Sequence, residues 1–81
     1  MDKHIIVGVH IVDREAHAVK VQAVFTQFGE QIKTRLGMHD DICPSNGLIL
    51  LEMADTPETC QMIEAVQAIG GVDCKTMVFE H

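Results

Sequence analysis

Histidine and cysteine are the residues of this sequence with the greatest capacity for chemistry. His10 lies in an apolar N-terminal segment, and His39 precedes Cys43 by four residues. Neutral imidazoles and thiolates that converge can hold a transition metal, so these three residues are candidate ligands for nickel, zinc or iron. A lone histidine in a strand is more often a hydrogen-bonded packing residue. A metal-sensing module is therefore an alternative interpretation, and the main prediction includes no metal.

The other reactive groups do not form a recognisable catalytic set. Asp40 and Asp41 are adjacent, so we expect their carboxylates to diverge rather than act as an acid/base pair. The spacing contains no Ser-His-Asp set and no Gly-rich phosphate loop, and it identifies no cofactor. We therefore predict that the chain has no catalytic residues.

The three cysteines are odd in number and have no CxxC spacing. This pattern argues against a disulfide framework and indicates reduced thiols, as in the cytosol. We expect Cys60 and Cys74 to be packing residues and Cys43, which precedes a proline, to be exposed.

Length and composition indicate one domain that spans residues 1–81, with 47% hydrophobic residues and a formal charge of −6. The six basic residues are scattered, which argues against direct nucleic-acid binding. No apolar run approaches the roughly 18 residues that a membrane span requires. The N-terminus has no signal-like pattern, so we expect a cytoplasmic protein with no membrane partner.

Apolar periodicity in the first half predicts a strand, a helix and a second strand. The first strand covers residues 4–12 and is apolar on both faces. Asp13 is the expected N-cap of the helix, whose apolar stripe consists of Ala18, Val21, Val24, Phe25 and Phe28. In the segment EQIKTRLGM, Ile32, Thr34, Leu36 and Met38 alternate with Gln31, Lys33 and Arg35. This alternation predicts a half-buried strand.

The second half repeats the pattern after a loop, HDDICPSNG, that contains a strong Asn46-Gly47 turn signal. The segment LILLEMAD predicts a third strand, again apolar on both faces. Asp55 or Thr56 caps the second helix, in which Pro57 suits the first turn. The buried stripe of that helix consists of Met62, Ile63, Val66 and Ile69, and the last strand covers VDCKTMVF.

The order of elements, β-α-β-β-α-β, predicts an α+β, ferredoxin-like fold. Right-handed crossovers place both helices on one face of a four-stranded antiparallel sheet. The usual strand order, 4-1-3-2, makes strands one and three central, and these are the two strands that are apolar on both faces.

The helices cover one face only, so the other face keeps an apolar patch that includes Met77 or Phe79. Large exposed apolar patches usually mark an interface. We expect a second copy of the chain to cover this face, or sheet edges to pair across a dimer within a larger assembly. The alternative is that the C-terminus or the loop around Cys43 folds over this face.

The stretches IIVGVHIVDREA, FGEQIKTRLGM and IGGVDCKTMVF together resemble the regulators of iron-only hydrogenase systems, a family of small ACT-like proteins. The resemblance covers nearly the whole chain, and RLGM is its most specific part. It implies a similarity to the ligand-sensing C-terminal domain of nickel-responsive repressors, without a DNA-binding arm. Those repressors use a His-x-His pair, which this chain lacks.

The resemblance also implies a function and a site. ACT-like domains form homodimers or homotetramers and bind small molecules, often amino acids, at subunit interfaces. Ligands lie near the turn after the first strand and near the neighbouring strand. The corresponding residues here are Asp13, Arg14, Arg35, Gly37, Met38 and His39.

The resulting hypothesis is a non-catalytic, ligand-sensing regulatory module that acts as a homo-oligomer. A protein partner would supply any DNA contact. Two alternatives stay open: a metal-sensing module that uses His10, His39 or Cys43, and a small ferredoxin-like dimeric enzyme with His10 as its inward polar group.

Overall fold

The computed structural model describes residues 3–80 and contains four strands, two α-helices and one 3₁₀ turn. In chain order these are β1 (Lys3–Ile11), α1 (Arg14–Gln27), η1 (Gly29–Gln31), β2 (Ile32–Met38), β3 (Gly47–Met53), α2 (Pro57–Gln67) and β4 (Val72–Glu80). This order confirms the predicted β-α-β-β-α-β arrangement.

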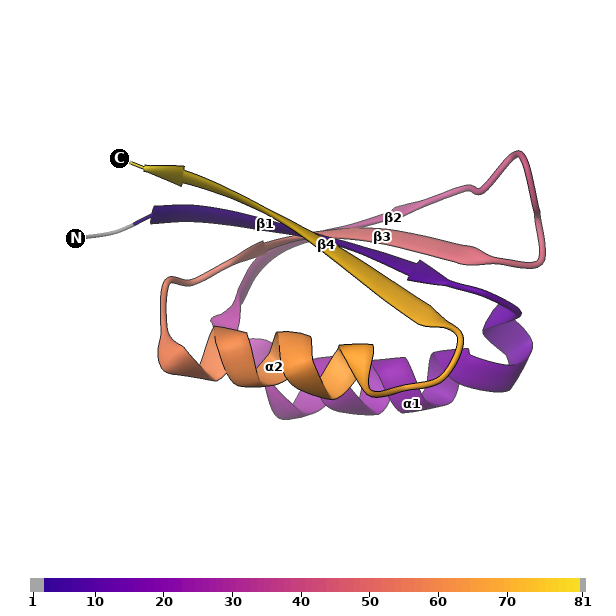
Figure 1. Cartoon of the computed structure of the whole chain (residues 1–81), viewed down its shortest axis with the longest axis horizontal. Helices are drawn as coiled ribbons and strands as arrows, with labels where there is room; N and C mark the ends of the chain where they lie inside the picture. The colour runs from indigo at the N-terminus through magenta and orange to yellow at the C-terminus, as the bar shows by residue number, and fades with distance from the viewer. Residues whose placement is uncertain (1–2, 81) are drawn as a thin grey trace.

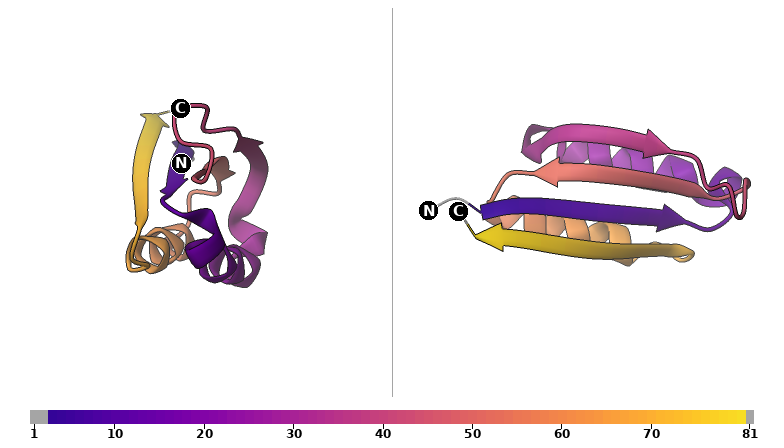
Figure 2. Two further views of the ribbon diagram at one scale, coloured as in Figure 1. Left: turned by 90° about the vertical axis from the view of Figure 1, so that its right-hand side faces the viewer. Right: turned by 90° about the horizontal axis from the view of Figure 1, so that it is seen from above.

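The strands form one antiparallel sheet in the order β2-β3-β1-β4. Both helices lie against the same face, below the sheet in Figure 1, and Figure 2 shows β1 and β3 in the centre. The predicted fold class and strand order are therefore confirmed. We call the face that the helices cover the helix face and the other the open face.

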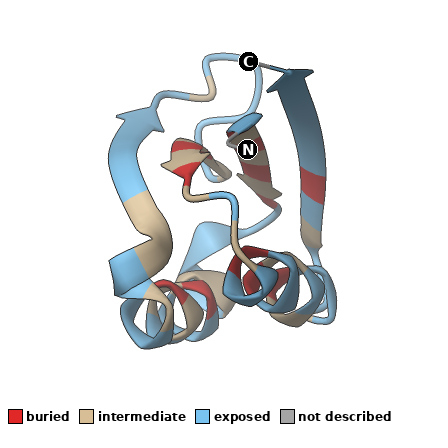
Figure 3. Cartoon of the chain, turned by 90° about the vertical axis from the view of Figure 1, so that its left-hand side faces the viewer, coloured by how far each residue is buried: buried red, intermediate tan, exposed pale blue. Residues whose placement is uncertain are grey.

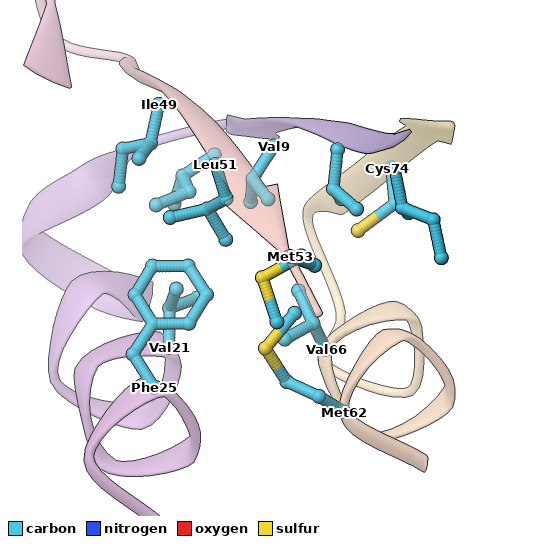
Figure 4. Packing of buried hydrophobic residues seen from close by; sticks show 12 residues of the cluster. Val9, Val21, Phe25, Ile49, Leu51, Met53, Met62, Val66 and Cys74 are labelled. Atoms are coloured by element: carbon cyan, nitrogen blue, oxygen red, sulfur yellow. The ribbon is translucent and has the colours of Figure 1, made fainter. Parts of the chain in front are cut away.

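The hydrophobic core lies between the helices and the two central strands (Figures 3 and 4). One side-chain parity of β1 and β3 supplies Ile5, Val7, Val9, Ile11, Ile49, Leu51 and Met53, and the helices supply Val21, Phe25, Met62 and Val66. Cys74 of β4 completes the cluster, as the sequence predicted. The periodicity missed one buried residue, Thr59, which can lie inside because its hydroxyl donates to the Ala54 carbonyl at 2.6 Å.

The prediction for β2 was partly wrong. Ile32 pairs with Met53 on the helix face, but Thr34 pairs with Glu52 on the open face, because the register shifts between Ile32 and Thr34. A β-bulge at Lys33 therefore reverses the side-chain parity of the rest of the strand. Every residue of β2 after Ile32 is exposed, so the strand is not half-buried in this chain.

The bulge determines which side chains of β2 lie on each face. Arg35 and Gly37, opposite Leu51 and Ile49, lie on the helix face. Leu36 and Met38 lie on the open face.

The open face carries apolar side chains from all four strands. Neighbouring strands pair Leu36 with Leu50, Met38 with Leu48, and Ile6 with Met77. The Leu50 side chain extends toward Gly8, and Phe79 lies opposite His4. Leu36, Met77 and Phe79 are each more than half exposed. We call these apolar side chains the open-face patch, of which Ile6, Leu48 and Leu50 are half-buried.

The link between β1 and α1 depends on an unusual backbone conformation. Asp13 has the N-cap position that the sequence predicted, but its φ is 50° and its side chain makes no capping hydrogen bond. Its backbone N–H instead donates to Asn46 Oδ1 at 3.0 Å. The residue therefore serves as a left-handed corner that turns the chain into α1, rather than as a side-chain cap.

Of the helices within residues 3–80, none has the length and apolarity that a bilayer crossing requires.

Replacement of Asp13 by valine is expected to lower the free energy of unfolding by about 1–2 kcal/mol, because a left-handed backbone is unfavourable for a β-branched residue. Asp13→Gly, the matched control, is expected to stay within about 0.5 kcal/mol of the parent, because glycine adopts this φ without strain. Urea denaturation measures both values. Equal losses for the two variants would show that the Asp13 side chain, and not its backbone, matters.

Candidate functional site

The candidate site lies at the end of the sheet where β1 and β2 end and β3 begins. A pocket of about 240 Å³ opens there between α1 and the sheet. It is bounded by Arg14, Ala18 and Gln22 of α1, by Gly37, Met38 and His39, and by Ile11 and residues 47–49. We call this pocket the α1–β2 groove.

A second hollow of about 270 Å³ adjoins the groove and is lined by Arg14, Met38, His39, Asp40, Asp41, Pro44 and Asn46. We call it the loop hollow, because residues 39–46 form most of its wall. Arg14, Met38 and His39 line both spaces. Four of the six residues that the resemblance implied are therefore brought together here: Arg14, Gly37, Met38 and His39.

A larger hollow of about 520 Å³ lies at the far end of α1, between residues 26–31 and Glu58. Its walls consist of Phe28, Gly29, two glutamates and three uncharged polar residues, and no basic or sulfur-containing residue lines it. We assign the candidate site to the smaller pair of spaces, because they combine a guanidinium, an imidazole and an apolar surface.

Arg14 owes its position to two hydrogen bonds with the loop that precedes β3. Its own backbone N–H donates to the Ser45 carbonyl at 3.0 Å, and the N–H of Asp13 donates to the Asn46 side chain. Arg14 is thereby placed where β1, α1 and the loop meet. Its guanidinium makes no hydrogen bond or ion pair with any other residue that the structure describes.

Arg35 and Asp13 do not line the groove or the loop hollow. The Arg35 guanidinium donates to Gln22 Oε1 at 2.7 Å and lies 5.1 Å from the centre of the Phe25 ring. It is thus held against α1 through Gln22, which lines the groove. Asp13 contributes through its backbone, as described above.

Sequence reasoning missed Ala18, Gln22 and Gly47 as groove residues. A signal for the first two was present, because Arg14, Ala18 and Gln22 are four residues apart and must share one helix face. Ala18 was instead assigned to the core stripe, and it is half-buried. Gly47 was interpreted only as part of a turn.

His10 makes a hydrogen bond that the sequence did not reveal. The Nε2 of His10 donates to Asp40 Oδ2 at 3.0 Å. The amide nitrogen of Asn46 lies 3.5 Å from His10 Nε2. The other carboxylate oxygen of Asp40 accepts the backbone N–H groups of Ile42 (3.1 Å) and Cys43 (2.9 Å). The cluster ties the loop to the open face, on which His10 lies.

These contacts change the acidity of Asp40. The hydrogen bond from His10 holds the pKa of Asp40 below its ordinary value of 3.8, and the backbone N–H groups of Cys43 and Ile42 lower the pKa further. Partial burial opposes this shift. Asp40 is therefore an anionic anchor for the loop rather than a proton donor near neutral pH.

The suspected metal ligands do not form a cluster. Within residues 3–80, no three side chains of His, Cys, Asp or Glu lie together in a way that could hold a metal ion. His10 is engaged with Asp40, and Cys43 Sγ lies 3.6 Å from Ser45 Oγ. Cys43 is exposed, as predicted, whereas Cys60 is exposed and not packed. The helix stripe through Met62 and Val66 turns Cys60 toward solvent.

No protein-family model matches the chain, and no curated protein matches it in sequence. Solved structures match the fold of the chain. The uncharacterized protein TM1266 from Thermotoga maritima superposes with a TM-score of 0.84 at 22% identity, over 99% of this chain and 100% of that one. The chain has a ferredoxin-like fold.

Two further structures share this fold at 11% identity. An unknown protein from Galdieria sulphuraria gives a TM-score of 0.64 and covers this whole chain, which spans 47% of that protein. SnoaB, a cofactor-independent oxygenase from Streptomyces nogalater, gives 0.53 over 100% of this chain and 94% of its own. At these identities the three similarities show the fold alone.

Acidification is expected to release the loop by protonating Asp40. Because the folded-state pKa is depressed, the contribution of Asp40 to stability is complete above its ordinary pKa of 3.8 and is lost as the pH falls through the folded-state value. The backbone amide proton shifts of Ile42 and Cys43, followed by NMR, should therefore change together with a midpoint below pH 3.8. Asp40→Asn should remove this transition. A midpoint above 3.8 in the parent would contradict the assigned hydrogen bonds.

Proposed function

We propose that this chain is a non-catalytic, ligand-sensing regulatory module that acts as a homo-oligomer, as a regulator associated with an iron-only hydrogenase system. The sequence stretches quoted above and the ferredoxin-like fold are consistent with that family. We further propose that the protein acts in the cytoplasm.

The observation that carries the proposal is the convergence of Arg14, Gly37, Met38 and His39 around one groove. These residues come from two segments of the chain more than twenty positions apart. The same four residues are among the ligand contacts that the resemblance implies. A groove with an unpaired guanidinium and an apolar wall is suited to bind a small molecule.

The open-face patch supports self-association. Apolar side chains of the open face come from all four strands, from Leu36 and Met38 on one edge strand to Met77 and Phe79 on the other. Their exposure to water is unfavourable by roughly 25 cal/mol for each Å² of apolar surface. A second copy packed on the patch would recover this free energy in a homodimer, and two dimers could pair further into a homotetramer.

The groove and the open-face patch are connected, which gives a route for regulation. Met38 lines the groove and also belongs to the patch, while His39 begins the loop that Asp40 fastens to His10 on the open face. A ligand that favours one arrangement of residues 38–40 would bias the surface presented to a partner copy. We propose that ligand binding in this way changes the assembly.

A protein partner would supply any contact with DNA. The chain carries a formal charge of −6, and its six basic residues are scattered along the sequence. Electrostatic binding to phosphates requires clustered Lys and Arg side chains.

Native mass spectrometry of tag-free protein is expected to give a dimer or a tetramer. Leu36→Lys and Leu50→Lys should each raise the dissociation constant of the assembly at least about 100-fold. Each substitution removes a leucine from both copies of a symmetric interface, and the burial of one leucine side chain contributes about 1.5–3 kcal/mol. Val19→Lys is the matched control, since Val19 is 80% exposed on α1, away from the patch. It should leave the assembly unchanged.

A parent protein that stays monomeric at high concentration would contradict the homo-oligomer proposal. Dissociation by Val19→Lys to the same extent as by Leu36→Lys would show that the interface is elsewhere. A small mass retained with the assembly would identify the ligand directly.

A further inference from the structure

The α1–β2 groove has a floor of small and apolar residues. Ala18 lies midway along its α1 wall, and Ile49 and Gly47 form part of its sheet wall. Gly37 lies opposite Ile49, so a side chain at position 37 would project onto the helix face. A Cβ placed there would meet no atom within 4 Å. The groove therefore exists partly because this position lacks a side chain.

Arg14 is the charged group at the end of this apolar floor. Arg35 is already engaged by Gln22 and Phe25, whereas the Arg14 guanidinium has no partner among the described residues. Asp41 lines the adjoining loop hollow but forms no ion pair with Arg14 within 4.0 Å, and Asp40 is engaged by His10 and two backbone N–H groups. Arg14 thus keeps its donors available to a ligand.

We infer that the α1–β2 groove binds a small carboxylate with an apolar body, the carboxylate on the Arg14 guanidinium and the body against Ala18, Gly37 and Ile49. The inference rests on the proposed function and adds the chemical class of the ligand. A planar guanidinium matches a carboxylate in a two-bonded geometry. The volume of about 240 Å³ is below the range of drug-sized sites, which requires a small ligand.

Polarity along the groove sets the orientation of the ligand. Gln22 lines the far end of the groove, and its Oε1 already accepts a hydrogen bond from Arg35. An acid placed at that end would have to displace this hydrogen bond, whereas at Arg14 it displaces no protein contact. The carboxylate therefore lies at the α1 N-terminal end of the groove, and the apolar body extends toward Gln22.

The test compares 4-methylpentanoate with its neutral isostere, 4-methylpentanamide, by ¹H–¹⁵N NMR titration of the full chain. The carboxylate is expected to shift the backbone resonances of Gly37 and Gly47 and to bind at least about tenfold more tightly than the amide. Arg14→Gln should abolish this preference. Lys20→Gln, which removes an exposed cation of α1 outside the groove, should preserve it.

A second pair of variants tests the location. Gly37→Leu is expected to place its side chain in the groove, because a Cβ at this position meets no atom within 4 Å, and to abolish binding of both probes. Gly29→Leu makes the same change at the other end of α1, where a Cβ also meets no atom within 4 Å, and it should leave binding unchanged. The dispersion of the amide spectrum confirms that each variant is folded.

Equal affinity for the two probes, a preference that survives Arg14→Gln, or no resonance change at Gly37 and Gly47 with millimolar carboxylate would each overturn the inference. Native mass spectra of the same samples distinguish a failure of this inference from a failure of the proposed function. Carboxylate binding without any change of assembly would support the inference and contradict ligand-controlled assembly. Assembly that responds to a ligand bound elsewhere would overturn the inference alone.

Discussion

The β-bulge between Ile32 and Thr34 is the constraint on which the rest of the structure depends. Side chains in a strand alternate between faces, so one extra residue reverses the orientation of every residue that follows. After the bulge, Gly37 lies on the helix face and leaves room for the groove. Leu36 and Met38 lie on the open face and extend its apolar patch to the sheet edge. Without the bulge, the side chains of Leu36 and Met38 would lie on the helix face and fill the space beside α1, and the groove would disappear.

The loop of residues 39–46 unites the two surfaces that the bulge creates. Its Asn46 side-chain oxygen and Ser45 carbonyl accept hydrogen bonds from the backbone N–H groups of Asp13 and Arg14, and these bonds position the start of α1. It also presents Asp40 to His10 on the open face. One short segment therefore contacts the groove, the helix start and the open face. This connection is the physical basis of the proposed coupling between ligand and assembly.

The small size of the chain explains why one face of the sheet stays uncovered. Two helices of 14 and 11 residues are enough to bury one parity of β1 and β3. The opposite parity of the same strands, which includes Ile6, Leu48 and Leu50, has no further layer in the described chain. Apolar residues on both faces of a two-layer domain are typical of proteins that complete their packing with another chain. The proposed homo-oligomer would account for the apolar residues on both faces of the central strands.

The sequence by itself determined the order of elements, the helix stripes and the central position of β1 and β3. These features follow from local periodicity and from the requirement that strands apolar on both faces lie inside the sheet. The sequence also contained the groove residues Arg14, Gly37, Met38 and His39, through a resemblance rather than through physics. Only the tertiary structure decided that Arg35 is held by Gln22 and Phe25, that Asp13 adopts a left-handed φ, and that His10 is bonded to Asp40. Each of these depends on strand register or on contacts between distant segments, and neither leaves a periodic signal in the chain.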